Sequence, residues 1–570
     1  MAVSGGDLLI DLLRSCGIEY IFCSPGSEWT PVWEGLLKCR EDGEAAPQYL
    51  NCRDEILAVS MAQGYAESTG GLPAVLLHAG AGSLHGAMAM RNAYSARVPL
   101  LIFGGESCEH RGDGEVGPQG WHWLGLLSDL ESPADLVKDY VKWSRAVSTA
   151  DNLADAVYRG SQIARAAPAG PVFISVTQEL MQKSPPDIRI SPPPRVVRTA
   201  PRLDDVRQAA QWLLQAKSPA IIVERAGGKP GVVKSLTELA EALGAPVFEG
   251  SVPFSSNFPR NHPLNLGLST AEALEEMDAV FIVSGTVPWY PASAGPASDA
   301  RVIVLDEAPR HENLPYWGYR VDLSLAADVE EGLAALADIV KGEMSKQKGP
   351  PTLYQKRAEL WRGRHEGMVK LWEDEALAGK GDKPIAAPWF LHTARQVFPD
   401  GAIILDETIV HARTVHRYLA EPGHYIKSAY GGLGVGIGET LGVKLANADR
   451  PVILIIGDGS FNYNPALAGL GFCQEYRMPI FIIILNNGGY MAMKYGYHRL
   501  HPGSTSSPRS TRRNYLGVDI TPPPDYTKIA GAFGVYGEKL EEPGDIEAAL
   551  KRGLAQIAKG RAALLDAVVA

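Results

Sequence analysis

The chain has 570 residues, of which 45% are hydrophobic and 21% are charged, and its formal net charge is −11. A chain of this length exceeds a single hydrophobic core, so we expect about three or four domains. The hydrophobic and charged contents are ordinary for a globular protein, so disorder is not the default expectation. The acidic balance argues against a nucleic-acid-binding surface, because phosphate recognition needs a clustered positive field.

The six cysteines are scattered without Cys-x-x-Cys spacing, so they predict neither a zinc site nor a disulfide framework. Scattered thiols are typical of a reducing compartment. The first residues include Asp7 and lack a basic start before an apolar run, so they do not resemble a signal peptide. No apolar stretch reaches the ~18 to 20 residues that span a bilayer. We therefore expect a soluble, cytoplasmic protein without nucleic-acid or membrane partners.

Two stretches have the composition of linkers. Residues 184–194 are dense in proline, which cannot hold a helix or an inner strand. Residues 344–388 are rich in glycine, proline and lysine at both ends and enclose a polar helical run near residues 353–376. The linkers divide the chain into pieces of ordinary domain size. We expect domains at residues 1–185, 200–343 and 385–570.

Each piece alternates short apolar runs with amphipathic helical patterns, which predicts a parallel sheet covered by helices. The expected strands are residues 20–22, 74–77, 100–103 and 172–174 in the first piece, 220–223, 279–283 and 302–305 in the second, and 402–405, 452–456 and 480–485 in the third. The predicted fold class is therefore α/β, with three consecutive domains that are each a mostly parallel sheet flanked by helices.

The most informative residues follow the last two strands of this series. Asp458 comes after the strand at 452–456, and Asn487 and Gly489 come after the strand at 480–485. The carboxyl ends of parallel strands meet at one sheet edge, where α/β folds bind ligands. A carboxylate, an amide oxygen and the Gly489 carbonyl are oxygen ligands of the kind that Mg²⁺ prefers. The sequence therefore predicts a magnesium site made by Asp458, Asn487 and Gly489.

The same turn predicts a place for a diphosphate group. Gly457 and Gly459 let the backbone approach the phosphates, and the helix start that includes Ser460 offers N–H groups to them. Each turn taken alone is also an ordinary strand-end turn. The two turns together, each after an apolar strand and joined by one helix, favour the ligand site.

These paired turns resemble the Gly-Asp-Gly and Asn-Asn motif of the thiamine-diphosphate-dependent enzymes, the family of acetolactate synthase, pyruvate decarboxylase and benzoylformate decarboxylase. The resemblance extends along nearly the whole chain and implies that thiamine diphosphate and Mg²⁺ are the cofactors. It also implies that the first domain binds the pyrimidine ring and that the third binds the diphosphate and the ion. The separation between Asp458 and Asn487 is slightly longer than in many relatives, and the connecting helix or its loop must absorb the difference.

Glu55 begins a helical run whose small residues, including Ala58 and Ala62, suit tight packing. A carboxylate in the first turn of a helix is usually only a partner of the helix dipole. The resemblance implies more, because a glutamate placed this way in the family hydrogen-bonds the aminopyrimidine ring and exchanges the proton that activates the cofactor. Glu55 is therefore a predicted catalytic and cofactor-binding residue.

Residues 430–434 form a glycine-rich turn with one bulky side chain, Leu433. In the family, a large aliphatic residue at this place supports a bent cofactor, and the resemblance assigns that role to Leu433, with Gly431 beside it. The alternative is a core leucine next to a tight turn. Glu55 and Asp458 lie on different domains, which belong to different subunits in the family. The resemblance thus implies a homodimer or homotetramer with its active site at the subunit interface.

Two loops of the first domain, residues 25–28 and 77–82, resemble the serine and histidine loops of benzoylformate decarboxylase. By this resemblance Ser27 would hold a substrate carboxylate and His78 would transfer protons. A turn serine and a structural histidine are the alternatives. Glu28 beside Ser27 is a further acid–base candidate. The weaker candidates are His110, His122 and His411, and the arginines Arg509, Arg512 and Arg513 of a polar loop that either closes over an anionic substrate or is only solvated.

Several subfamily features are missing from the sequence. It has no adjacent His-His pair of the pyruvate decarboxylase kind, and the Gln-Trp pair common in biosynthetic acetolactate synthases does not follow Asn487. Where benzoylformate decarboxylase has a second active-site histidine, this chain offers Trp289 and Tyr290. That difference disfavours benzoylformate and leaves another apolar or aromatic substrate open. FAD or ADP in the central domain is compatible with the family, but no fingerprint indicates it.

The sequence therefore predicts an enzyme, a thiamine-diphosphate- and Mg²⁺-dependent 2-oxo-acid decarboxylase or carboligase that acts on a small carbonyl substrate through an enamine intermediate. The first alternative is a carbon–carbon lyase or hydrolase that uses the same cofactor on a 2-hydroxyketone, a diketone or a 2-hydroxyacyl-CoA. The second alternative is a non-catalytic cofactor-binding homologue, against which the intact Glu55 and Asp458 argue.

Overall fold

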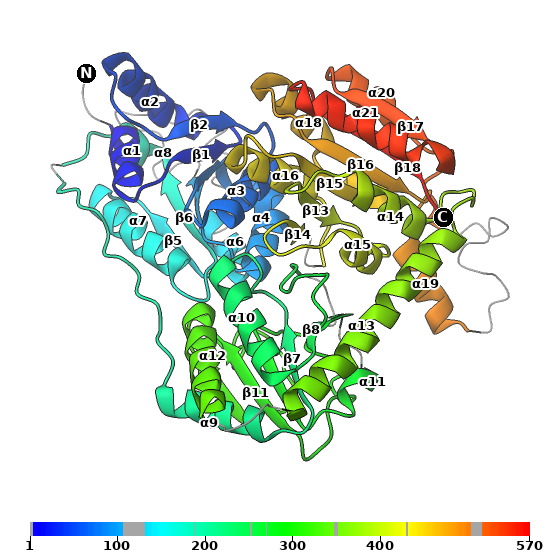
Figure 1. Cartoon of the computed structure of the whole chain (residues 1–570). Coiled ribbons are helices and arrows are strands. Elements are labelled where there is room, and N and C mark those ends of the chain that lie inside the picture. The colour runs from blue at the N-terminus through cyan, green and yellow to red at the C-terminus, as the bar shows by residue number, and fades with distance from the viewer. Residues whose placement is uncertain are drawn as a thin grey trace.

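The computed structural model of the chain describes residues 4–106, 132–186, 188–250, 254–268, 271–346, 352–428, 431–502 and 516–570. These residues form three β-sheets in succession along the chain, and each sheet has six strands. Figure 1 shows the first sheet in blue and cyan, the second in green and the third in yellow to red, each flanked by helices. The α/β class and the succession of three sheet domains are confirmed.

The first sheet has the strand order β2-β1-β3-β4-β6-β5, and all its pairs are parallel. Its strands are β1 (Tyr20–Cys23), β2 (Gln48–Asn51), β3 (Ala74–Leu77), β4 (Leu100–Glu106), β5 (Trp143–Val147) and β6 (Pro171–Thr177). Its helices are α1 (Gly5–Ser15), α2 (Thr30–Asp42), α3 (Glu55–Thr69), α4 (Ala79–Ala96), α6 (Pro133–Leu136), α7 (Ala150–Arg165) and α8 (Gln178–Gln182). Strands β3 and β6 are buried along their whole length, as their continuous apolar runs predict.

The second sheet has the order β12-β11-β10-β7-β8-β9, again with parallel pairs. Its strands are β7 (Pro219–Val223), β8 (Val247–Glu249), β9 (Asn265–Leu268), β10 (Ala279–Val283), β11 (Arg301–Asp306) and β12 (Leu323–Ala326). Its helices are α9 (Leu203–Gln215), α10 (Pro230–Leu243), α11 (Ala271–Leu274) and α12 (Val329–Ser345). This domain has its own hydrophobic core, which includes the buried Trp289.

The third sheet has the order β14-β13-β15-β16-β18-β17. Its strands are β13 (Ile403–Glu407), β14 (Tyr425–Lys427), β15 (Val452–Gly457), β16 (Phe481–Asn486), β17 (Tyr536–Leu540) and β18 (Ala563–Val568). Its helices are α14 (Ala387–Val397), α15 (Ala412–Leu419), α16 (Gly436–Ala446), α17 (Asp458–Tyr463), α18 (Ala466–Tyr476), α19 (Met491–Leu500), α20 (Tyr526–Ala532) and α21 (Ile546–Ala558). The strand order changes direction between β13 and β15, and open parallel sheets bind ligands at such a switch point.

The strands that sequence patterns did not predict are mostly short edge strands. Strands β5 and β17 lie at sheet edges and are largely exposed or half-buried, so they lack the continuous apolar run of a buried strand. Strand β18 is buried but contains Asp566, whose carboxylate accepts a hydrogen bond from the Asn486 side chain at 2.9 Å. Asp566 interrupts the apolar run of β18, so the sequence pattern did not predict this interior strand.

The longest described helix, α13 (Thr352–Ala378), lies between the second and third sheets and packs against α14 and β9. It corresponds to the polar helical run expected near residues 353–376. None of the helices in the described ranges combines the length with the apolar character that a membrane span needs.

Helices α3 and α16 pack closely and join the first sheet to the third (Figure 1). A Cβ on Gly64 would lie 2.1 Å from the carbonyl oxygen of Glu439, and a Cβ on Gly442 would lie 1.9 Å from that of Met61. Only glycine leaves room for backbones this close. One hydrophobic core therefore continues through both domains.

An ion pair and a hydrogen bond attach the second sheet domain to the first. The Arg97 guanidinium is 3.0 and 3.2 Å from the two carboxylate oxygens of the buried Asp306. Arg225 donates to the Ser95 carbonyl at 2.9 Å. The first contact joins the end of α4 to the carboxyl end of β11, and the second joins it to the carboxyl end of β7. The second domain therefore faces the first with the carboxyl edge of its sheet.

We predict that Gly442→Ala destabilises the protein, because the added methyl group meets the Met61 carbonyl. Overpacking of this kind costs about 1–3 kcal/mol, and thermal unfolding followed by circular dichroism should show a lower midpoint. Gly342→Ala is the matched control, since this exposed glycine of α12 has no atom within 4 Å of an added Cβ. An unchanged midpoint for Gly442→Ala would contradict the close helix packing.

Candidate active site

The two polar turns predicted to bind a metal lie side by side at one edge of the third sheet. Strands β15 and β16 are parallel neighbours, with Gly457 opposite Leu485. Asp458 begins α17 directly after β15, and Asn487 directly follows β16. The connection between them contains two helices, α17 and α18, where one was expected. Pro465 separates them, because proline interrupts a helix.

Each of these turns carries a buried side-chain oxygen without a hydrogen-bond partner in the described part of the chain. The two atoms are Oδ2 of Asp458 and Oδ1 of Asn487. Burial raises the pKa of Asp458 to about 6, although hydrogen bonds from the backbone N–H groups of Gly459, Gly489 and Gly488 oppose the rise. A buried oxygen with no donor is unusual, and two of them on adjacent strand ends fit a divalent cation.

The glycines of these turns allow close backbone approaches. A Cβ on Gly459 would lie 2.7 Å from the Tyr490 ring, and one on Gly489 would lie 2.7 Å from the Val518 carbonyl oxygen. Gly457 has open space beside it, with the nearest atom 3.8 Å from an added Cβ. The carbonyl of Gly489 already accepts from the Met491 N–H at 3.0 Å and keeps a second lone pair for a ligand.

The turn that contains Leu433 is held by a carboxylate that sequence patterns did not single out. Glu407 ends β13, and its buried carboxylate accepts from the N–H groups of Gly434, Val435 and Gly436 at 2.6, 3.1 and 3.1 Å. Asn464, which follows α17, donates to the same carboxylate at 2.7 Å. Glu407 therefore connects the Leu433 turn to the helix of Asp458. An acidic residue at the end of an apolar strand was the available signal.

The Leu433 turn has the backbone that its glycines predict. Gly431 and Gly434 have φ values of +80° and +107°, which side-chain-bearing residues rarely adopt. Leu433 is half-buried and packs against the core shared by the first and third domains. The bulky side chain thus stands on a rigid turn immediately before α16.

Glu55 occupies the first turn of α3, as predicted. Asp54 caps the helix, because its side chain accepts from the Leu57 N–H at 2.9 Å. The Glu55 side chain is only 16% exposed, and its Oε2 is 2.7 Å from Nδ1 of His85 on α4. His85 was not predicted, because its partner lies far away in the sequence.

Ser27 and His78 lie at the ends of neighbouring strands of the first sheet. Ser27 is exposed and begins the 3₁₀ helix η1 (Ser27–Trp29), and His78 immediately precedes α4. The buried carboxylate of Glu28 is 2.9 Å, by both oxygens, from Nδ1 of His78. It also accepts from the Ala79 N–H at 2.8 Å. Glu28 and His78 thus form a carboxylate–imidazole pair.

Two glycines make room for this pair. A Cβ on Gly26 would lie 2.5 Å from a Glu28 oxygen and 2.6 Å from Nδ1 of His78. A Cβ on Gly105 would lie 2.3 Å from the Glu28 side chain. Burial raises the pKa of Cys23, at the end of β1, to about 12, a hydrogen bond with Tyr49 opposes the rise, and the charges of Glu28 and Glu55 add to it.

The predicted residues therefore form two groups. Glu55, Ser27 and His78 belong to the first domain, whereas Asp458 and Asn487 belong to the third. Among the described residues, no hydrogen bond or ion pair joins Glu55 to Asp458 or to Asn487. Within one chain, the group of the first domain and the group of the third domain therefore make no direct hydrogen bond or ion pair through these described residues.

The remaining candidates contribute less. His411 directly precedes α15. Trp289 is 2% exposed and donates to the Ala292 carbonyl within the core of the second domain, whereas Tyr290 is exposed. Outside the described residues lie His110, His122, Arg509, Arg512 and Arg513.

In the second domain, the carboxylate of Glu224 accepts hydrogen bonds from backbone N–H groups that a bound nucleotide would otherwise use. Glu224 follows β7, and the N–H groups of Thr286 and Val287 after β10 donate to it at 2.6 and 2.9 Å. Burial raises the pKa of Glu224 to about 7, and these hydrogen bonds oppose the rise. N–H groups at such a sheet edge commonly bind phosphate, so a nucleotide here would have to displace Glu224.

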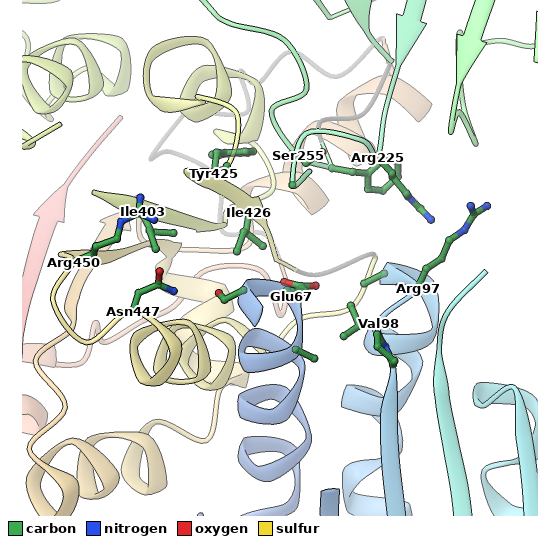
Figure 2. Close-up of a pocket in the computed structure, with 17 residues that line it drawn as sticks. Glu67, Arg97, Val98, Arg225, Ser255, Ile403, Tyr425, Ile426, Asn447 and Arg450 are labelled. Carbon is green, nitrogen blue, oxygen red and sulfur yellow. The ribbon is translucent and has the colours of Figure 1, made fainter. Parts of the chain in front are cut away.

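A separate cavity of about 360 Å³ lies where the three domains meet (Figure 2). Glu67 reaches it from the last turn of α3, Arg225 from the end of β7 and Arg450 from the residues before β15. Because α3 begins at Glu55 and β15 ends just before Asp458, the cavity lies at the opposite ends of these elements. It is therefore not part of the candidate active site.

Three family models match the chain in succession. The N-terminal TPP binding domain of thiamine pyrophosphate enzymes matches residues 3–121, the central domain matches residues 206–336, and the C-terminal TPP binding domain matches residues 410–567.

Curated relatives match along the whole chain. Benzoylformate decarboxylase of Pseudomonas aeruginosa is 27% identical over 96% of this chain and 95% of its own length. The acetolactate synthase isozyme 3 large subunit of Escherichia coli is 22% identical over 100% and 95%. The 2-hydroxyacyl-CoA lyase 2 of Danio rerio is 23% identical over 99% and 91%.

Solved structures share the fold. The thiamine diphosphate-dependent 4-hydroxybenzoylformate decarboxylase of Rhodococcus jostii RHA1 superposes with a TM-score of 0.78 at 24% identity, covering 99% of both chains. Benzoylformate decarboxylase from Polynucleobacter necessarius gives a TM-score of 0.78 at 20% identity, covering 99% of this chain and 98% of its own.

The family matches also contain the two groups of candidate residues. Glu55 lies within the N-terminal match, and Asp458 and Asn487 lie within the C-terminal match. With N-terminal, central and C-terminal models matched in order, the chain belongs to the thiamine pyrophosphate enzyme family.

Proposed function

We propose that the protein is a thiamine-diphosphate- and Mg²⁺-dependent 2-oxo-acid decarboxylase or carboligase that acts on a small carbonyl substrate. One observation carries the proposal: Oδ2 of Asp458 and Oδ1 of Asn487 are buried on adjacent strand ends without partners among the described residues. Such atoms cost free energy unless a ligand pairs with them. A divalent ion that also binds a diphosphate supplies that pairing.

The first and third domains would bind different parts of the cofactor, the pyrimidine ring and the diphosphate respectively. Asp458, Asn487 and the carbonyl of Gly489 would hold Mg²⁺. Gly457 and Gly459, with Ser460, would face the diphosphate from the start of α17. When bound, thiamine diphosphate supplies a nucleophilic carbon and an electron sink next to the substrate carbonyl.

The Leu433 turn would support the bent cofactor. Gly431 and Gly434 have positive φ values that suit only glycine, and Glu407 holds the following N–H groups. A side chain on so constrained a turn can press against a ligand without yielding. This rigidity supports the assignment of Leu433 to the cofactor site.

Glu55 would hold the proton that activates the aminopyrimidine ring. Its side chain is largely shielded from solvent at the start of α3, and a shielded carboxyl group can exchange a proton with a ligand without competition from water. Ser27 would hold a substrate carboxylate. His78 would transfer protons, with Glu28 accepting from Nδ1–H, so Nε2 is the ring nitrogen that takes up a proton.

The proposal requires at least two subunits. Glu55 begins α3 in the first domain and Asp458 begins α17 in the third, and the resemblance to the family implies that the two domains around one cofactor come from different subunits. We therefore propose a homodimer or a homotetramer, in which the first domain of one subunit and the third domain of another complete each site.

The test of the function is an activity panel with thiamine diphosphate and Mg²⁺. Pyruvate, branched and aromatic 2-oxo acids are offered, and carbon dioxide and the organic product are both measured. Carbon dioxide release supports the proposal. Cleavage of a 2-hydroxyketone, a diketone or a 2-hydroxyacyl-CoA without carbon dioxide would instead indicate a non-decarboxylating lyase or hydrolase. Cofactor binding without turnover of any substrate would favour a non-catalytic protein.

We predict that thiamine diphosphate with Mg²⁺ raises the melting temperature more than either alone, and that Asp458→Ala abolishes this gain. A ligand at 100 times its Kd stabilises the folded state by about 2.7 kcal/mol, which differential scanning fluorimetry detects. Asp374→Ala, at an exposed position of α13, is the control that should keep the full gain. An equal gain in the Asp458 variant would rule out the proposed ion site.

We predict that Glu55→Gln keeps cofactor binding but lowers kcat at least about 100-fold, because the amide cannot exchange a proton. Isothermal titration calorimetry measures the first quantity, and steady-state kinetics measures the second. Glu359→Gln, an exposed position of α13, should leave both unchanged. A fully active Glu55→Gln enzyme would disprove the assigned role.

We predict that Glu28→Gln lowers kcat by about 10- to 100-fold, because His78 loses the carboxylate that holds its tautomer and orientation. The matched control is Glu34→Gln, an exposed position of α2 in the same domain. Melting curves of both variants separate a catalytic loss from unfolding. A Glu28→Gln protein that is folded and equally active would show that the pair is only structural.

A further inference from the structure

His85 contacts the carboxylate that the proposed function places at the cofactor. Its Nδ1 is 2.7 Å from Oε2 of Glu55, and its Nε2 is 4.0 Å from Oδ2 of Asp54. Asp54 is held separately, because its other oxygen accepts from the Leu57 N–H as the cap of α3. The Glu55 contact is therefore the strong one, a charge-assisted hydrogen bond between α4 and the first turn of α3.

The two oxygens of Glu55 have different surroundings. Oε2 accepts from His85, whereas Oε1 has no hydrogen-bond partner among the described residues. Oε1 lies beside Gly82, where a Cβ would be only 3.1 Å away. A larger residue at this place would crowd that oxygen. Oε2 of Glu55 therefore has a hydrogen-bond partner, whereas Oε1 has open space beside Gly82.

We propose that His85 is a positioning residue for Glu55, which holds Oε2 and leaves Oε1 as the oxygen that exchanges the proton with the cofactor. The inference rests on the proposed function and deepens it. A histidine differs here from a non-titrating donor, because an imidazolium stabilises the Glu55 carboxylate more strongly than a neutral imidazole does. The protonation of His85 therefore changes how strongly the Glu55 carboxylate is held at Oε2.

The surrounding charges agree with this role. The hydrogen bond to Glu55 is the largest cause of a raised pKa of His85, burial opposes it, and the charges of Asp54 and Glu55 add to it. Helix α4 also packs against β3, β4, β6, α6 and the 3₁₀ helix η2 (Lys138–Tyr140), and within the described ranges no titratable group of those elements, including Lys138, Asp139 and Tyr140, contributes to the shift. When the pH rises above the His85 pKa, the imidazolium is lost and Glu55 keeps only a contact with a neutral imidazole.

The first test observes the pair without turnover. The cofactor-free protein is labelled with ¹³C at the histidine rings, and the His85 signal is identified by its loss in His85→Asn. We expect the His85 titration midpoint to move to lower pH in Glu55→Gln, because the charged acceptor is gone. An unmoved midpoint would overturn the proposal, since the two groups would then not interact in solution.

The second test is kinetic and uses the holoenzyme. His85→Asn keeps a hydrogen-bond donor but cannot titrate, and His85→Leu removes the donor. We expect His85→Leu to lower kcat about tenfold with little change in KM. His85→Asn should recover most of kcat but lose the inflection that His85 gives to the pH profile. Equal kcat values and pH profiles for both variants and the parent would refute the role.

Controls separate this inference from the proposed function. His262→Asn removes a comparable histidine–carboxylate pair, with Glu241 at 3.3 Å, in the second domain, and should leave kcat and the pH profile unchanged. If Glu55→Gln is inactive but the His85 variants match the parent, the function stands and the His85 role fails. If Glu55→Gln is itself fully active, the failure belongs to the proposed function.

Discussion

The close packing of α3 against α16 is the constraint that holds the first domain against the third within each chain. Glu55 lies in the first turn of α3, and the turn that contains Leu433 leads directly into α16. Glycines at positions 64 and 442 let the two backbones touch, so each helix start is placed relative to the other. A larger distance between α3 and α16 would displace both the helix start of Glu55 and the turn of Leu433. It would also open the hydrophobic core that the first and third domains share.

Three buried carboxylates at strand ends differ in how completely they are paired. Glu407 and Glu224 accept hydrogen bonds from backbone N–H groups at strand ends and hold loops in place. Asp458 also accepts hydrogen bonds from backbone N–H groups, yet its Oδ2 has no hydrogen-bond partner among the described residues. This incomplete pairing is the feature on which the proposed role of Asp458 as an ion ligand depends.

Two carboxylate–imidazole pairs lie at the same edge of the first sheet. Glu28 pairs with His78 and Glu55 pairs with His85, and both histidines belong to the start of α4 or to the residue before it. Glycines beside each pair leave room for the carboxylates. Because His78 caps the start of α4 and His85 lies within it, the substrate-side and cofactor-side proton exchanges proposed here would share one rigid element.

The sequence by itself determined the three sheets, because continuous apolar runs between helices have no other stable arrangement. It also placed Asp458 and Asn487 at one edge, since residues that directly follow parallel strands share that edge, and it located Glu55 at a helix start. Only the tertiary structure decided that His85 contacts Glu55 and that Glu407 holds the Leu433 turn. The physical reason is distance along the chain: local patterns encode periodicity, whereas a hydrogen bond between remote residues depends on how crossovers bring their strand ends together.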